Sequence, residues 1–133
     1  MTVHTYLFFD GSCEEAIRFY GEAFGAELEY LMRFKEGPAE LQVPGWEEKV
    51  LHARVSFGES ALDMSDARPG EQAAFSGFAL IMHLDQIERA EEVFAALGMG
   101  GQVLLPLAPT FWARRYGIVK DRFGVTWKVQ VSQ

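Results

Sequence analysis

The chain has 133 residues, a length typical of one domain, and its 49% hydrophobic residues are enough for a core without a disulfide or a structural metal. Nineteen acidic against twelve basic residues give a net charge of −7, which argues against binding to nucleic acids and to anionic membranes. A single cysteine, Cys13, excludes an internal disulfide and a Cys-based zinc site. Because no signal peptide or long apolar segment is present, we expect a cytoplasmic protein.

The first half of the chain is predicted to form a strand, a helix and three more strands. A strand is expected over residues 3–9, and Ser12 with Glu15 forms a predicted capping box for a helix that ends at Gly25. Further strands are expected over residues 26–34, 49–57 and 60–66, with a loop over 35–48, a two-residue turn at 58–59 and a linker over 67–75.

The same order of elements recurs in the second half of the chain. A strand over residues 76–84 precedes a helix for which Asp85 is the predicted N-cap, with Glu88 at the third position, and the glycines of residues 98–101 end that helix. Three more strands are expected over residues 102–105, 112–120 and 125–131. The repeated order predicts an α+β fold of two βαβββ modules, residues 1–66 and 76–133, within one domain over residues 1–133.

Several strings of residues carry a resemblance to a known family. They lie at residues 6–11, 13–20, 24–27 and 62–66, and in the segment from Phe111-Trp112 to Phe123-Gly124-Val-Thr-Trp127. Together with the repeated elements, these strings resemble the vicinal oxygen chelate superfamily of glyoxalase I, bleomycin-resistance proteins and extradiol dioxygenases, and within it the PhnB-like branch. The resemblance covers nearly the whole chain. It implies mixed sheets that form a cup, with the helices on the outer faces.

Some PhnB-like relatives carry the domain label 3-demethylubiquinone methyltransferase. A methyltransferase needs a site for S-adenosylmethionine, and no glycine-rich loop follows the first predicted strand of this chain. The sequence therefore gives no support to that activity here.

The resemblance also implies metal ligands on the first and last strand of each module. Those positions fall on His4, Asp63, Ala79 and Lys128. Only His4 and Asp63 have the chemistry of a metal ligand, whereas a catalytic divalent ion needs three or more N or O ligands. We therefore expect neither a metal site of the glyoxalase type nor a cofactor. As a hypothesis, the ammonium group of Lys128 takes the place of the cation and pairs with Asp63.

Strand alternation identifies candidate ligand-binding residues. Side chains that alternate with the buried ones point into the expected cup. A cluster of Trp112, Arg115 and Tyr116 close to the mouth of the cup can stack on a flat ligand and hold an anionic group, although a packed interface between subunits explains that cluster about as well. The candidate residues are His4, Tyr6, Phe8, Asp63, Trp112, Arg115 and Lys128.

Three functions fit these observations. The first is binding of an unidentified small molecule in a metal-free cup, as the resemblance to bleomycin-resistance proteins implies. The second is a divalent-metal-dependent lyase, isomerase or transferase of the glyoxalase or fosfomycin-resistance type, and the third is an interaction module without pocket chemistry. The resemblance also implies a homodimer, in which His4 and Asp63 of one chain face Ala79 and Lys128 of the other.

Overall fold

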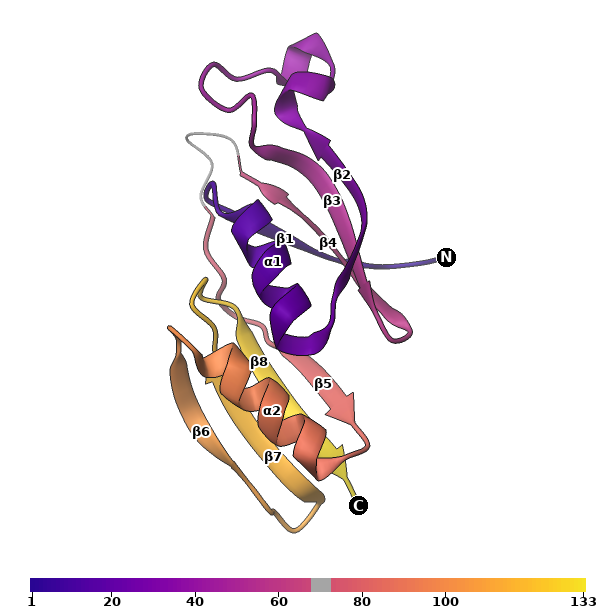
Figure 1. Cartoon of the computed structure of the whole chain (residues 1–133), viewed down its shortest axis with the longest axis vertical. Helices are drawn as coiled ribbons and strands as arrows, with labels where there is room; N and C mark the ends of the chain where they lie inside the picture. The colour runs from indigo at the N-terminus through magenta and orange to yellow at the C-terminus, as the bar shows by residue number, and fades with distance from the viewer. Residues whose placement is uncertain (68–72) are drawn as a thin grey trace. The chain divides into compact units, whose positions relative to one another are not determined.

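The computed structural model describes residues 1–67 and 73–133. These residues contain eight strands and two α-helices. They group into two units, residues 1–74 and residues 75–133. Each unit is a four-stranded mixed sheet with one α-helix across one of its faces (Figure 1). This is the predicted α+β architecture of two βαβββ modules. Residues 68–72 of the expected linker lie outside the described residues.

The first unit follows the order strand, helix, three strands. Its elements are β1 (Thr5–Phe9), α1 (Cys13–Phe24), β2 (Glu27–Arg33), β3 (Val50–Phe57) and β4 (Ser60–Asp66). In the sheet the strand order is β1-β4-β3-β2; β1 and β4 are parallel, and the other neighbours are antiparallel. The expected loop over residues 35–48 is largely irregular, with two short 3-10 turns, Phe34–Glu36 and Ala39–Leu41.

The second unit repeats this topology. Its elements are β5 (Leu80–Leu84), α2 (Ile87–Gly98), β6 (Gln102–Ala108), β7 (Ala113–Lys120) and β8 (Thr126–Ser132). The strand order is β5-β8-β7-β6, with β5 and β8 parallel. The strand predicted over residues 102–105 is longer in the structure and passes through Pro106. A proline fits there because β6 is an edge strand, where a missing backbone N–H costs no sheet hydrogen bond.

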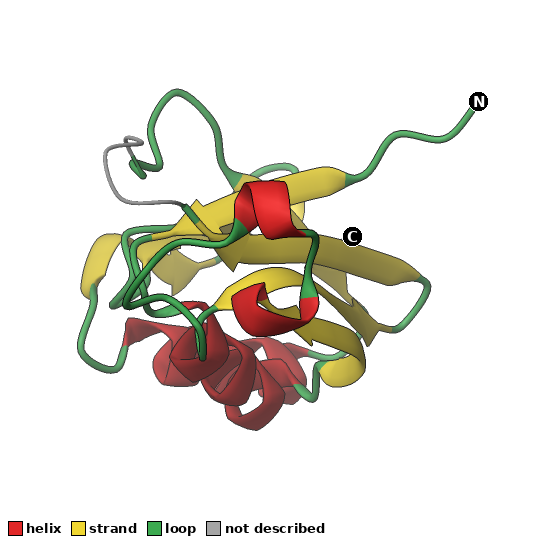
Figure 2. Ribbon diagram, turned by 90° about the horizontal axis from the view of Figure 1, so that it is seen from above, coloured by secondary structure: helices red, strands yellow, loops and turns green. Residues whose placement is uncertain are grey.

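Each core lies between the helix and one face of its sheet, as the separate helix and strand layers show (Figure 2). Apolar residues recur at helical spacing in α1 and α2, while every second residue of the strands faces the helix. The largest fully buried side chains include Tyr20 and Phe9 in the first unit and Trp127 and Leu97 in the second. Among the described residues, no α-helix of the same unit lies on the opposite face of either sheet.

Ser12 is the N-cap residue of α1, as predicted, but the capping box with Glu15 does not form. Ser12 makes no side-chain cap hydrogen bond and lies outside the extended conformation that an N-cap residue usually adopts. Instead, the buried carboxylate of Asp66 accepts a hydrogen bond from the backbone N–H of Cys13 at 2.9 Å and one from Val50 at 3.0 Å. Asp66 is the last residue of β4. The start of α1 is therefore capped by a residue that is distant in sequence, and not by the side chain of the local Ser12. At α2 the N-cap position is Gln86 rather than Asp85.

The predicted turns are confirmed. Gly25 ends α1 in the left-handed conformation, with φ of 79°. Gly58 and Glu59 join β3 to β4 in a two-residue hairpin, in which Phe57 and Ser60 are paired. A two-residue turn fixes which residues of the two strands lie opposite each other, and this register places Arg54 opposite Asp63.

Candidate functional site

A row of four polar and aromatic residues crosses the uncovered face of the first sheet. The strand register places Tyr6 of β1 beside Asp63 of β4, Asp63 beside Arg54 of β3, and Arg54 beside Tyr30 of β2. Residues in register on neighbouring strands share a face of the sheet. The row therefore consists of Arg54 and Asp63 at its centre, with Tyr6 at one end and Tyr30 at the other. We call this row the charged row.

Arg54 and Asp63 form a bidentate ion pair at the centre of the charged row. The guanidinium Nε donates to Oδ1 at 2.6 Å and Nη2 donates to Oδ2 at 3.1 Å. The side chain of Asp63 is only 10% exposed, whereas that of Arg54 is 37% exposed. The hydrogen bonds from Arg54 hold the pKa of the Asp63 carboxyl below its ordinary value of 3.8. Both carboxylate oxygens therefore already have a cationic partner.

Tyr6 and His52 are joined by a hydrogen bond on the same face. The Tyr6 hydroxyl lies 3.0 Å from Nδ1 of His52, and their rings are stacked with centroids 5.7 Å apart. Burial raises the pKa of Tyr6 above its ordinary value of 10.0, so its hydroxyl is protonated near neutral pH. The tautomer of His52 decides which of these two groups donates.

The other predicted residues of the first unit lie on or near this face. The Phe8 ring is 48% exposed and contacts the Tyr6 ring at 5.0 Å between centroids. His4 precedes the first residue of β1 and is exposed, in the segment that extends away from the sheet (Figure 2). Tyr6, Phe8 and Asp63 are therefore brought together, and His4 lies at the edge of the group.

The uncovered face of the second sheet carries an aromatic pair and a lysine. Trp112 contacts Tyr116 edge to face, with centroids 5.2 Å apart. The ammonium nitrogen of Lys128 lies 5.8 Å from the centroid of the Tyr116 ring, within the range of a cation–π interaction. The structure thus places two of the predicted residues, Trp112 and Lys128, around Tyr116.

Arg115 lies elsewhere. In the register of β7 and β8, Arg115 is opposite Val131 and Gly117 is opposite Val129, and both valines are buried on the face that α2 covers. Alternation therefore puts Arg115 on the covered face and Tyr116 on the uncovered one. One guanidinium nitrogen of Arg115 donates to the backbone carbonyl of Arg114 at 2.7 Å.

The four positions at which the resemblance implies metal ligands do not fit a metal ion. Asp63 is held by Arg54, Lys128 is a cation, and Ala79 has no donor side chain. Within the described ranges, no group of three or more His, Cys, Asp or Glu side chains is arranged to hold a metal ion. His4 alone keeps the chemistry of a ligand.

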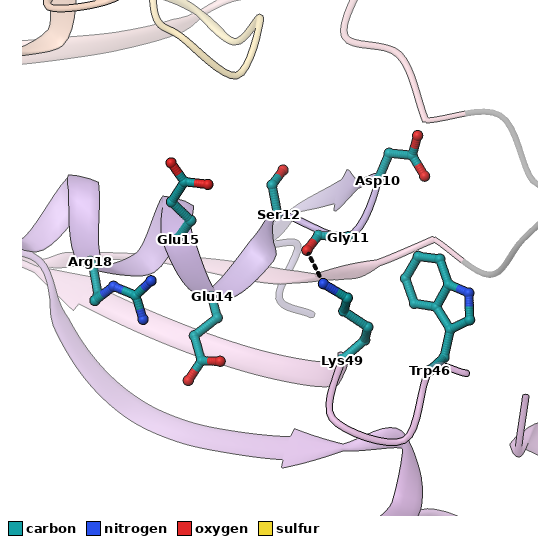
Figure 3. Close-up of a pocket in the computed structure, with 8 residues that line it drawn as sticks. All are labelled: Asp10, Gly11, Ser12, Glu14, Glu15, Arg18, Trp46 and Lys49. Carbon is teal, nitrogen blue, oxygen red and sulfur yellow. Dashed lines mark hydrogen bonds between the residues drawn. The ribbon is translucent and has the colours of Figure 1, made fainter. Parts of the chain in front are cut away.

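A separate pocket of about 500 Å³ lies beside the first turn of α1 (Figure 3). Trp46 and Lys49, from the segment between β2 and β3, form one side of it, and the Lys49 ammonium donates to the carbonyl of Gly11 at 2.9 Å. Its lining residues are Asp10, Gly11, Ser12, Glu14, Glu15, Arg18, Trp46 and Lys49. None of the predicted ligand-binding residues belongs to it.

Sequence reasoning missed Arg54 and Tyr30 as components of the first face. Arg54 was detectable, because a two-residue turn at residues 58–59 puts Arg54 opposite Asp63 by counting outward from the turn. The place of Tyr30 beside Arg54 was not detectable, because the register between β2 and β3 shifts next to Tyr30.

The ion pair predicts a pH dependence of stability. Because the pKa of Asp63 is lower in the folded chain than its ordinary value, its stabilising contribution is present at neutral pH and is lost as the pH falls through the folded pKa. Denaturant unfolding of the wild type and of Asp63→Asn is expected to show a stability difference that shrinks between about pH 5 and pH 2. A difference of equal size at both pH values would contradict the depressed pKa.

Cys13 is predicted to be unreactive. The side chain is fully buried in the first turn of α1, and its burial, with the nearby carboxylates of Asp66 and Glu14, raises the pKa of the thiol far above its ordinary value. A chromogenic disulfide reagent at pH 8 is expected to label no thiol in the native chain and one thiol in denaturant. Rapid labelling of the native chain would show that this first turn opens readily.

These features are those of a known fold family. The family model described as "Glyoxalase/Bleomycin resistance protein/Dioxygenase superfamily" matches residues 2–129, and the chain belongs to this superfamily. None of the helices in the described residues has the length and apolar character that a membrane-spanning helix needs.

Several relatives resemble the chain over nearly its whole length. Protein YjdN of Escherichia coli K12 is 35% identical over 142 residues, which cover 98% of this chain and 95% of YjdN. The crystal structure of protein PA1353 from Pseudomonas aeruginosa is 37% identical, with a TM-score of 0.90 and coverage of 100% and 98%. A Bacillus cereus structure described as a putative 3-demethylubiquinone-9 3-methyltransferase, PhnB protein, is 25% identical, with a TM-score of 0.84 and coverage of 99% and 100%. The fold of the chain is thus PhnB-like.

Proposed function

We propose that this chain binds a small organic molecule on the uncovered faces of its sheets, and that a metal ion is not part of the site. The proposed site residues are His4, Tyr6, Phe8 and Asp63 on the first unit, and Trp112 and Lys128 on the second. Arg115, on the covered face of β7, is left out of the proposal.

The observation that carries the proposal is the charged row. A metal ion would have to displace Arg54 from a nearly buried carboxylate, and this would break two charge-assisted hydrogen bonds. An organic ligand needs no such displacement. It can contact the exposed rings of Phe8 and Tyr30 and use the free ring nitrogen of His52, all on one face.

The test is a thermal-shift screen of small organic molecules in the presence of a chelator, with each hit mapped by amide chemical shifts of the full chain. A ligand of the folded state raises the unfolding temperature. Hits are expected to shift amides of β1, β3 and β4 or of β7 and β8. Hits that stabilise the chain only after a divalent metal is added would overturn the proposal in favour of a metal-dependent lyase, isomerase or transferase.

Two matched variants locate the ligand of the first unit. Arg54→Met breaks the charged row, and Arg18→Met removes the same group from the pocket beside α1. For a hit on the first sheet, affinity is expected to fall in Arg54→Met and to persist in Arg18→Met. The reverse result would place the ligand in the pocket and contradict the proposed site.

We also propose that the chain forms a homodimer. In support, the edge strand β6 exposes Val103, Leu104 and Leu105, each between 42% and 49% exposed, and contiguous exposed apolar side chains are typical of protein interfaces. Light scattering is expected to give twice the mass of 15.0 kDa for the wild type. A monomer at micromolar concentration would overturn this proposal.

A further inference from the structure

The uncovered face of the second sheet differs from that of the first sheet in its charge. In the first sheet, the cation at the centre of the face is neutralised by Asp63. In the second unit, the five acidic residues lie after β5, on α2 and in the turn before β8, so the four strands contain no Asp or Glu. This is unusual in a chain whose net charge is −7. The second face is a cationic surface on an acidic protein.

Lys128 is the cation at the centre of that face. No ion pair links it to a carboxylate within residues 75–133, all of which are described. Its register partners are Ile81 of β5 and Ile118 of β7, so Lys128 has an apolar residue beside it on each neighbouring strand. Apolar neighbours lower the local polarity, and an anion therefore gains more from pairing with this ammonium than with an ordinary surface lysine.

An aromatic platform lies next to the ammonium group, formed by Trp112 and Tyr116. Trp112 is 44% exposed, and its edge-to-face contact with Tyr116 holds the two rings together. Phe111 extends the platform, with its ring centroid 4.9 Å from that of Trp112. Rings held in this way offer both faces and edges to a flat ligand at low cost in conformational entropy.

From this juxtaposition of an unpaired lysine and exposed rings, we propose that the second sheet binds a flat aromatic anion. Lys128 pairs with the anionic group, and the platform of Trp112 and Tyr116 contacts the ring. This inference rests on the proposed function and names the chemical class of its ligand. It also moves the anion-binding role from Arg115, where the sequence suggested it, to Lys128.

The test compares two probes of the same shape, 2-naphthoate and its uncharged analogue 2-naphthalenemethanol, by calorimetry on the full chain at low ionic strength. Naphthoate is expected to bind about tenfold more tightly than the alcohol, because only naphthoate forms a charge-assisted pair with Lys128. Its amide shifts are expected to centre on β7 and β8. Added salt is expected to lower the affinity for naphthoate and to leave the affinity for the alcohol unchanged.

Variants assign the effect to particular residues. Lys128→Gln is expected to abolish the preference for naphthoate, and Lys128→Arg to retain it. Trp112→Ala is expected to weaken both probes. Arg89→Gln is the matched control, because it removes the same charge from the exposed side of α2, where Arg89 pairs with Glu92.

Two results would overturn the inference. Equal affinity for the two probes, or a preference that survives in Lys128→Gln, would show that the second face does not select anions. In either case, uncharged hits from the chelator screen that map to the sheets would leave the proposed function standing. If no molecule in that screen stabilises the chain, the result would instead contradict the proposed function itself.

Discussion

Asp121→Ala is expected to lower the free energy of unfolding by about 3–5 kcal/mol. The Asp121 carboxylate is buried in the turn before β8. It accepts hydrogen bonds from the backbone N–H groups of Phe123 at 2.9 Å and Val125 at 3.0 Å, and from the indole N–H of Trp127 at 3.0 Å. Alanine leaves the two fully buried donors, those of Val125 and Trp127, without this acceptor. Each such donor costs about 1–3 kcal/mol, and the smaller loss at Phe123 adds to this.

Urea unfolding followed by tryptophan fluorescence measures this loss. Asp85→Ala is the matched control, because Asp85 is an exposed aspartate of the same unit and its side chain caps no helix. The control is expected to change stability by less than about 0.5 kcal/mol. Asp121→Asn keeps one acceptor oxygen and is expected to lie between alanine and the wild type. A loss below about 1 kcal/mol for Asp121→Ala would show that water replaces the carboxylate.

Gly101→Ala is expected to cost about 3 kcal/mol or more. A Cβ atom at Gly101 would overlap the carbonyl oxygen of Lys120 and lie 3.0 Å from the backbone of Asp121. These are backbone atoms of the end of β7 and of the turn that Asp121 organises, so they cannot move aside as a flexible side chain does. The added methyl group therefore forces the start of β6 away from β7.

Gly98→Ala is the matched control for this substitution. Gly98 ends α2, and a Cβ atom there would meet only side-chain atoms of Val119 and Val103, at 3.6 and 3.8 Å. Alanine also favours the helix, so the control is expected to be neutral or to stabilise the chain by up to about 1 kcal/mol. Comparable losses for the two variants in urea unfolding would contradict the role given to the close approach at Gly101.

Both substitutions bear on the proposed ligand face. Trp127 and Lys128 are consecutive in β8, so the first is buried toward α2 while the second points to the uncovered face. The turn that Asp121 and Gly101 hold in place sets the start of that strand. A partial loss of stability there is therefore expected to reduce naphthoate affinity as well.

The fold was predictable from the sequence because its signals are local. Periodicity located α1 and α2, Gly25 marked the end of α1, and the turn at residues 58–59 marked the β3–β4 hairpin. The helix caps were not predictable in this way. The carboxylate that caps α1 belongs to Asp66, which is far from Cys13 in sequence and reaches it only because β4 pairs with β1.

The candidate site was predictable only in part, because the alternation of side chains along a strand is also a local signal. Alternation within single strands identified Tyr6, Asp63 and Lys128, but it does not show which residue of a neighbouring strand lies beside them. The partner of Asp63 is Arg54, and this depends on pairing across strands. The face assigned to Arg115 depends on a register shift between β7 and β8, which alternation does not reveal.

We propose that the ion pair of Arg54 and Asp63 replaces a metal ion at Asp63, one of the positions where the family resemblance implies a metal ligand. The most direct test is the metal content of the untagged chain as purified, followed by calorimetric titration of the chelator-treated chain with Zn²⁺, Ni²⁺, Mn²⁺ and Fe²⁺. The ion pair between Arg54 and Asp63 predicts well under one equivalent of metal and no saturable heat. One tightly bound equivalent per chain, lost in Asp63→Ala, would contradict it.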